Sequence, residues 1–291
     1  WLHQVLVTGT PSGFNWVHDA FGHPSEKLNE GIHVVQARTE DNREHLPDGY
    51  IESLRSLYSA RLAAQELDGS VVHLEGLVFS AFSPDRHVID CSWPDHAKTW
   101  AGIDFGYRNP AVTFWRKHPE QPNAWVCFDE LMPQDITTEQ LADRISARGY
   151  NLEEAWCDPA GKAATTAGRT DVEAMRRAGI PAKYRTASRI RRVAFGLEIM
   201  RAALDPADGS EPRLYIHERL THGSKRGIHR ALLSYRFKGK SEAPDKDGTY
   251  DHAIDCARYM IANTLGLDRR TVMQNKRPGP LPRSTERLIE L

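Results

Sequence analysis

The sequence predicts a mixed α/β fold, in which helices cover the faces of a sheet of parallel and antiparallel strands. From residue 99 onward, three apolar segments follow one another across short turns, and predicted helices and strands then alternate. The chain has 291 residues, of which 40% are hydrophobic, so it can bury a substantial core. At about 150 residues per domain, this length suggests roughly two domains.

Few elements are predicted in the first 98 residues. Apolar runs at 5–8 and 31–37 predict two short strands. Pro47 stands where a first-turn proline belongs, and the helix that it opens is expected to reach about Leu67. Residues 76–98 show little hydrophobic periodicity and contain two prolines, which predicts a linker.

The remainder of the chain carries most of the predicted sheet. Residues 99–105, 111–117 and 124–131 are apolar and joined by turns, which predicts an antiparallel meander of three strands. Beyond it we expect helices over 137–148, 170–178, 188–204, 223–234 and 250–265, and strands over 154–158, 182–185 and 213–217.

Charge is distributed unevenly, although the net charge is only −1. Residues 1–98 carry 7 basic and 14 acidic side chains, whereas residues 183–240 carry 14 basic and 5 acidic. Such a basic excess can neutralise several DNA phosphates, but it can also be a solvated helix face. The candidate DNA contacts in and near this stretch are Arg191, Arg192, Lys225, Arg226, Lys238 and Lys240.

Several classes of protein are disfavoured. The four cysteines are too widely spaced for a zinc ribbon or a disulfide framework. No apolar run approaches the ~20 residues of a membrane span, and no signal-peptide pattern is present, so we expect an intracellular protein without a membrane contact. The sequence begins at Trp1 rather than Met, and we interpret it as part of a longer protein.

Acidic residues mark three places in the predicted layout. Asp104 lies near the end of the first meander strand, and Asp158 follows the apolar part of the strand at 154–158 directly. Asp251 and Asp255 lie one turn apart at the start of the last helix and share a face. Converging carboxylates need a cation, and hard oxygen ligands select Mg²⁺ or Mn²⁺. Two such ions would activate a water molecule and stabilise the leaving oxygen of a phosphodiester.

Each of these acids also has a structural interpretation on its own. Asp104 suits a turn at a strand end, Asp158 an Asx turn before Pro159, and Asp251 the N-terminal turn of a helix. The catalytic hypothesis therefore depends on their joint order with the meander and the basic stretch.

Two further patterns are set aside. Residues 125–130 look like the strand-then-acid pattern of an ATPase magnesium site, but the sequence contains no G-x-x-x-x-G-K-[ST] phosphate loop, so Asp129 and Glu130 are interpreted as strand-end residues. His252 and Cys256 are four apart on a helix without a second ligand pair, which favours packing over metal ligation.

In this order the motifs resemble the large terminase subunit of tailed bacteriophages, which cuts and packages viral DNA. Residues 102–106 with Asn109-Pro110 look like the opening nuclease strand of that family, and residues 156–161 and 250–259 look like its second and third acidic motifs.

Upstream segments extend the resemblance to nearly the whole chain, up to about residue 266. Thr8, Gly9 and Thr10, followed by Pro11, are similar to the ATPase coupling motif of the family. Residues 39–51 resemble the end of its ATPase domain, and residues 67–79 resemble its passage into the linker.

The resemblance implies a ribonuclease H-like nuclease preceded by the C-terminal remnant of a P-loop ATPase domain. It implies two-metal cleavage of double-stranded DNA concatemers, with Asp104, Asp158 and Asp251 as catalytic residues and metal ligands and Asp255 as a further ligand. The implied partners are a portal protein, a small terminase subunit and further copies in a ring, in the cytoplasm of the bacterial host. The phosphate loop and catalytic glutamate of the family's ATPase lie upstream of this sequence, so no ATPase activity is expected from it alone.

The expected organisation follows from this resemblance. Residues 1–75 are the end of the ATPase domain, 76–98 the linker, 99–266 the nuclease domain, and 267–291 a basic, proline-containing tail that crosses a surface or is disordered.

Two alternatives remain open. Another ribonuclease H-like nuclease, such as a junction resolvase or a transposase, would share the acids but not the segment from Thr8 to Phe79. A DNA-gripping module of the motor without catalytic activity would use the basic stretch alone.

The segment 236–249 is long for a connection and carries several basic residues. The resemblance suggests a β-hairpin here beside the metal site. We hypothesise that it moves between covering the site and gripping DNA; a plain connection is the alternative.

Overall fold

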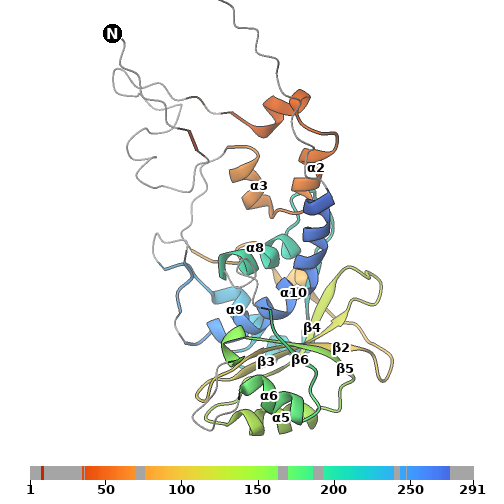
Figure 1. The fold of residues 1–291 in the computed structure, drawn as a ribbon, viewed down its shortest axis with the longest axis vertical. Helices are drawn as coiled ribbons and strands as arrows, with labels where there is room; N and C mark the ends of the chain where they lie inside the picture. Colours follow the sequence, from red (N-terminus) through yellow and green to blue (C-terminus); the bar gives the residue numbers. More distant parts are fainter. Residues whose placement is uncertain are drawn as a thin grey trace, which may run out of the picture.

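The computed structural model describes residues 8–9, 35, 37–69, 76–162, 170–185, 193–238, 243–246 and 248–275. Within them, seven strands form one mixed sheet in the order β1-β7-β4-β3-β2-β5-β6. Figure 1 shows strands of this sheet as a layer near the lower end of the view, beneath α9 and α10. The strands are β1 (Val88–Ile89), β2 (Thr99–Asp104), β3 (Ala111–Lys117), β4 (Trp125–Leu131), β5 (Leu152–Cys157), β6 (Ala182–Lys183) and β7 (Leu214–His217).

The centre of the sheet is the predicted antiparallel meander, since β3 pairs with β2 on one side and with β4 on the other. β5 and then β6 extend the sheet in parallel from β2, while β7 and then β1 extend it in parallel from β4. The predicted mixed α/β fold is therefore confirmed.

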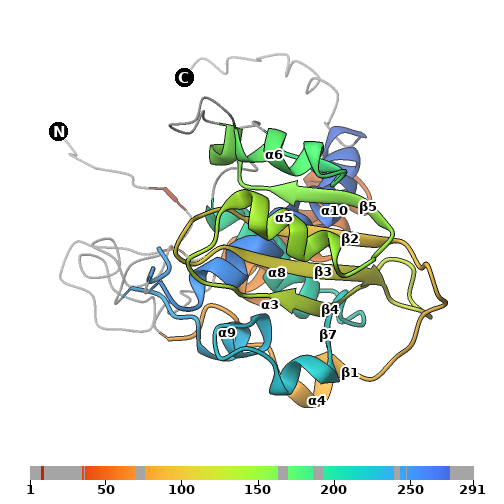
Figure 2. The same ribbon diagram turned by 90° about the horizontal axis from the view of Figure 1, so that it is seen from below.

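Helices cover both faces of this sheet. α5 (Thr138–Ser146) and α6 (Asp171–Arg177) lie on one face, in front of the strands in Figure 2, over a core of sheet and helix side chains that includes Ile103 and Phe114. The opposite face carries α8 (Val193–Leu204), α9 (Ile228–Ser234) and α10 (Asp251–Asn275). This second core is larger, and Trp115 lies within it.

The starts of α5 and α6 follow from their sequences. Thr137 and Thr170 each accept a hydrogen bond from the backbone N–H three residues later, and the Gln or Glu at that position bonds back to the capping threonine. These reciprocal capping boxes satisfy backbone donors that a helix end leaves unpaired.

The prediction of a single helix from Pro47 to Leu67 is wrong. The structure has the 3-10 helix η1 (Thr39–His45), α2 (Tyr50–Arg55) and α3 (Ala60–Glu66). The helical segment is interrupted before Ser59. The side chain of Ser59 accepts a hydrogen bond from the Leu62 N–H and so caps α3.

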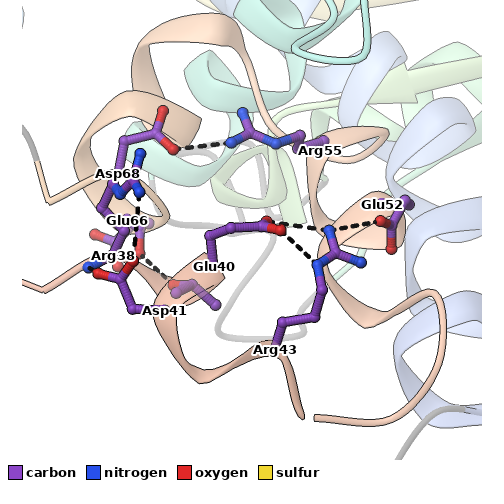
Figure 3. Close-up of polar contacts among 9 residues, drawn as sticks. Arg38, Glu40, Asp41, Arg43, Glu52, Arg55, Glu66 and Asp68 are labelled. Carbon is purple, nitrogen blue, oxygen red and sulfur yellow. Dashed lines mark hydrogen bonds and ion pairs between the residues drawn. The ribbon is translucent and has the colours of Figure 1, made fainter.

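Ion pairs join these short elements to one another (Figure 3). Arg43 contacts Glu40 in η1 and Glu52 in α2, and Arg55 bonds to Asp68 after α3 at 2.8 Å. Because these side chains are substantially exposed, each pair stabilises the segment only weakly.

Residues 76–98, predicted as a linker, pack against the sheet unit. Val78 and Phe79 are fully buried in the core that contains α8. The short helix α4 (Pro84–His87) follows, and β1 pairs with β7 at the edge of the sheet. This segment thus contributes an edge strand that its lack of periodicity did not predict.

Three other elements differ from expectation. The helix predicted over 223–234 is instead η3 (Glu218–His222) followed by α9, and α10 continues to Asn275, into the predicted tail. Asp158 is followed by a further 3-10 turn, η2 (Pro159–Lys162). The strands predicted at 5–8 and 31–37, the start of the helix at 188 and the tail after 275 fall largely or wholly outside the described residues.

Of the helices in the described part of the chain, none combines the length and apolar character needed to cross a lipid bilayer.

Candidate active site

Two of the predicted acids lie side by side at the carboxyl ends of two adjacent interior strands. Ile103 pairs with Cys157 in the parallel β2–β5 ladder, so Asp104 and Asp158 follow at the carboxyl ends of adjacent strands. The backbone N–H of Asp158 donates to the Ile103 carbonyl at 3.2 Å, which ties the two strand ends together. The Asp158 side chain accepts a 2.9 Å hydrogen bond from the Ala160 N–H, the Asx turn expected from its sequence.

α10 crosses directly over this pair of strands. A Cβ at Gly102 would overlap the backbone oxygen of Cys256, so only glycine allows the helix to lie this close to β2. The buried Cys256 thiol donates to the Ala111 carbonyl at 3.0 Å and has a packing role, as predicted. This close approach carries the acids of α10 to the end of β2.

Asp104 has a carboxyl with a strongly raised pKa. It is only 7% exposed, and this burial raises the pKa of its carboxyl to about 6. The negative charges of Asp255 and Asp158 act in the same direction, while the hydrogen bond from His252 opposes them. An elevated carboxyl pKa next to other acids is typical of functional sites.

His252 is a site residue that the sequence reasoning missed, since packing was expected for it. Its Nδ1 lies 2.8 Å from Oδ2 of Asp104, and this hydrogen bond raises the pKa of the imidazole. The signal was its position beside Asp251 in the third acidic motif.

Asp255 is held by two cationic side chains. Nε and Nη2 of the buried Arg258 lie 2.9 and 2.8 Å from its Oδ1, and Nζ of Lys246 lies 3.8 Å from its Oδ2. The stem of Arg258 passes over Gly196 of α8, where a Cβ would overlap it. A buried, doubly hydrogen-bonded arginine fixes the orientation of this carboxylate.

Asp251 occupies a different position from Asp255. The strongest charge effects on Asp104 come from Asp255, His252 and Asp158, whereas Asp251 acts on His252. Asp251 is 8% exposed, and its buried Oδ1 has no hydrogen-bond partner among the described residues. Asp255 is therefore the acid of α10 whose charge is felt most directly at Asp104.

The donor set fits a hard divalent cation in chemistry, because it consists of carboxylate oxygens at one edge of a sheet. In the conformation described, however, no group of three or more His, Cys, Asp or Glu side chains is arranged to hold a metal ion, within the residues that the structure covers. The carboxylates of Asp104, Asp158 and Asp255 each accept a hydrogen bond from a protein group through one oxygen, and a cation bound at Oδ2 of Asp104 would compete with His252.

The candidate DNA contacts separate into three groups. Lys225 and Lys238 are exposed. Arg226 is engaged within the fold: its guanidinium donates to Asn109 Oδ1 at 2.5 Å and to the carbonyl of Met132 at 2.8 Å. The candidates outside the described residues are Arg191, Arg192 and Lys240.

Of the predicted coupling motif, Thr8 and Gly9 are described as two isolated residues outside any helix or strand, and Thr10 lies outside the described residues.

Asp129 and Glu130, set aside above, are engaged in structural contacts near the end of β4. Glu130 accepts hydrogen bonds from the N–H groups of Ile228 and Ser224 at 2.7 and 3.1 Å, and so caps the start of α9. Asp129 pairs with Arg148 at 3.0 Å.

Comparisons with known proteins bear directly on this arrangement. No protein-family model matches the chain. The large terminase subunit of Escherichia phage T5 is 26% identical to it over 167 residues, which are 54% of this chain and 38% of that protein.

Two solved structures show the same fold. The large terminase from a thermophilic bacteriophage matches 88% of this chain and 62% of its own, with a TM-score of 0.63 and 17% identity. The nuclease domain of the P22 large terminase matches 66% of this chain and 93% of its own, with a TM-score of 0.50 and 14% identity.

The predicted resemblance to phage large terminase subunits is thereby confirmed, and the two solved structures share the mixed α/β fold of this chain. The chain spans less than two thirds of the length of the phage T5 protein and of the large terminase from the thermophilic phage.

Proposed function

We propose that this chain carries the metal-dependent endonuclease of a viral DNA-packaging motor, which cuts double-stranded DNA concatemers by phosphodiester hydrolysis. The observation that carries the proposal is the juxtaposition of Asp104 and Asp158 at adjacent strand ends, beneath the helix that bears Asp255. The likeness to large terminases supports the same assignment.

In this proposal Asp104, Asp158 and Asp255 hold Mg²⁺ or Mn²⁺ ions, and Asp251 is a further ligand candidate. Two bound ions would supply an activated water and stabilise the leaving oxygen. The protein's own groups do the positioning: Arg258 orients Asp255, and His252 orients Asp104 and exchanges a proton with it.

The wider assignment follows the same resemblance. The proposed substrate is double-stranded DNA, contacted through exposed basic side chains such as Lys225 and Lys238. The proposed partners are a portal protein, a small terminase subunit and further copies in a ring, acting in the host cytoplasm. ATP hydrolysis is assigned to the part of a large terminase that this sequence does not contain.

Plasmid nicking tests the enzymatic assignment. Supercoiled DNA incubated with the chain and Mn²⁺ is expected to become nicked or linear, and EDTA is expected to abolish this conversion. The absence of cleavage with Mn²⁺ and with Mg²⁺, at protein concentrations that bind the DNA, would contradict the proposal.

A second function is favoured by one observation. Since Asp104 and Asp255 are each held by a basic side chain of the protein, a DNA-gripping module without catalysis is consistent with the same geometry. It predicts DNA binding without cleavage. A resolvase or transposase is disfavoured because the match to the thermophilic phage terminase, at 88% of the chain, extends well beyond the 66% that the P22 nuclease domain matches.

A further inference from the structure

The turn between β2 and β3 presents two side chains to solvent close to Asp104. Tyr107 is 62% exposed, unusually high for a large aromatic residue. Arg108 beside it is also exposed and forms no ion pair with another described residue. Neither side chain is explained by the core of the fold, and an exposed aromatic beside a charged group is typical of a contact surface.

This turn is braced rather than loose. The carbonyls of Tyr107 and Arg108 accept hydrogen bonds from the N–H groups of Ile136 and Asp135, both at 3.2 Å. Asn109 Oδ1 accepts two more, from Arg226 at 2.5 Å and from Gln134 at 3.2 Å. A contact made from a backbone that is already ordered loses little conformational entropy on binding.

The chain length between the turn and the acids limits their separation. Tyr107 follows Asp104 by three residues, so their Cα atoms lie at most about 11 Å apart. Successive nucleotides of one DNA strand rise about 3.4 Å along the duplex axis, so this span corresponds to roughly three nucleotides. A phosphate held beside Asp104 by the proposed cation would therefore have its neighbouring nucleotides within reach of the turn.

We infer that Tyr107 and Arg108 form a DNA contact that flanks the scissile phosphate. The Tyr107 ring packs against a nucleotide next to the cleaved bond, and the Arg108 guanidinium pairs with a neighbouring phosphate. The inference rests on the proposed nuclease function and adds a substrate-positioning surface to it. The earlier candidates for DNA contact all lie on later segments of the chain.

Binding measurements on the whole chain test this surface. A short fluorescent DNA duplex is titrated in EDTA, so that affinity is measured without cleavage, over a series of salt concentrations. Tyr107→Ala is expected to weaken binding about tenfold, with an unchanged dependence of log affinity on log salt, because ring packing involves no ionic contact. Tyr107→Phe keeps the ring and should retain wild-type affinity.

Arg108 supplies an independent readout. Arg108→Ala should lower the salt slope by about one unit, as expected for the loss of one phosphate contact. Leu233→Ala is the matched control, because Leu233 is another exposed large apolar residue, 38% exposed on α9. It should leave both affinity and slope unchanged. Thermal unfolding of all variants verifies that they are folded.

The outcomes distinguish this inference from the proposed function. If the wild-type chain binds and cuts DNA but Tyr107→Ala and Arg108→Ala match it in affinity and salt slope, the contact surface is wrong and the nuclease assignment stands. If the wild-type chain neither binds nor cuts DNA, the proposed function fails and this inference fails with it.

Discussion

Nδ1 of His252 lies 2.8 Å from Oδ2 of Asp104, although the two residues are 148 positions apart in the sequence. The bond joins the first turn of α10 to the last residue of β2. It also means that a proton, shared between imidazole and carboxylate, occupies a position where a metal cation would compete for the same oxygen.

This competition predicts a pH dependence of metal affinity. Burial raises the pKa of Asp104 to about 6, and a protonated carboxyl is a poor ligand, so the affinity for Mn²⁺ should increase as the pH rises through about 6. Calorimetric titration with Mn²⁺ at a series of pH values measures this dependence and the protons released. Affinity that is constant from well below to well above that pH would contradict it.

The acids should differ in their importance for cleavage. Asp104→Asn and Asp158→Asn are each expected to abolish it while the protein stays folded, a larger loss than the roughly 10- to 100-fold caused by removing a supporting residue. Asp255→Asn should be more damaging than Asp251→Asn, because the Asp255 charge acts directly on Asp104. Rates of plasmid nicking with Mn²⁺ test this ranking, and circular dichroism verifies that the variants are folded. A higher cleavage rate for Asp255→Asn than for Asp251→Asn would contradict the prediction.

Adjacent residues Lys225 and Arg226 should give opposite phenotypes. Lys225 is exposed, so Lys225→Ala should reduce the salt slope of DNA binding by about one unit without affecting stability. Arg226→Ala leaves the Met132 carbonyl without this donor and Asn109 Oδ1 with Gln134 alone, and should lower the free energy of unfolding by about 1–3 kcal/mol. Chemical denaturation and DNA titration of both variants test the contrast, and equal stability of the two would refute it.

The segment 236–249 forms antiparallel contacts where it is described. Lys238 N–H donates to the Ala243 carbonyl and Asp245 N–H to that of Arg236, at 3.0 and 2.8 Å, as a β-hairpin requires. In the next residue, Lys246, the Nζ atom lies 3.8 Å from Oδ2 of Asp255.

Lys246→Met removes a positive charge beside Asp255 and should therefore raise the affinity for Mn²⁺. We expect an increase of only about two- to fivefold, because the lysine is exposed and its charge is screened. Lys238→Met, on the same segment, serves as the control. Shortening the segment to a tight turn should change cleavage or DNA binding if it gates the site; unchanged activity would leave only the plain connection.

Gly102→Ala should destabilise the fold. Its Cβ would overlap the Cys256 carbonyl, and relief of this overlap requires α10 to move away from β2. We expect a loss of about 1–3 kcal/mol in the free energy of unfolding, together with reduced cleavage because α10 carries Asp255. Thermal unfolding measures the first effect, and an unaltered melting temperature would show that the helix can shift without cost.

The sequence predicted the centre of the sheet because β2 to β4 are apolar segments with clear turn signals between them. It did not predict β1, since a two-residue strand has no measurable periodicity. The break between α2 and α3 was missed although Ser59, a typical N-cap residue, marks it.

The candidate site was predictable in part for a similar reason. Asp104 and Asp158 stand at strand ends, and strand ends can be recognised locally. The pairing of His252 with Asp104 depends on how α10 lies across the sheet, which no local pattern records. Likewise, Lys225 and Arg226 are equivalent as charges in sequence, and only the packing of the turn at Asn109 distinguishes them.

The position of β1 has a practical consequence for work with isolated fragments. A fragment that begins at residue 99 would leave the backbone of β7 unpaired along an open edge and would remove Phe79 and Phe82 from the interior against which they pack. Unpaired edges and newly exposed aromatic pockets promote aggregation. A fragment of the sheet domain that is to remain soluble should therefore begin before Gly76, whose carbonyl accepts a hydrogen bond from the Phe237 N–H.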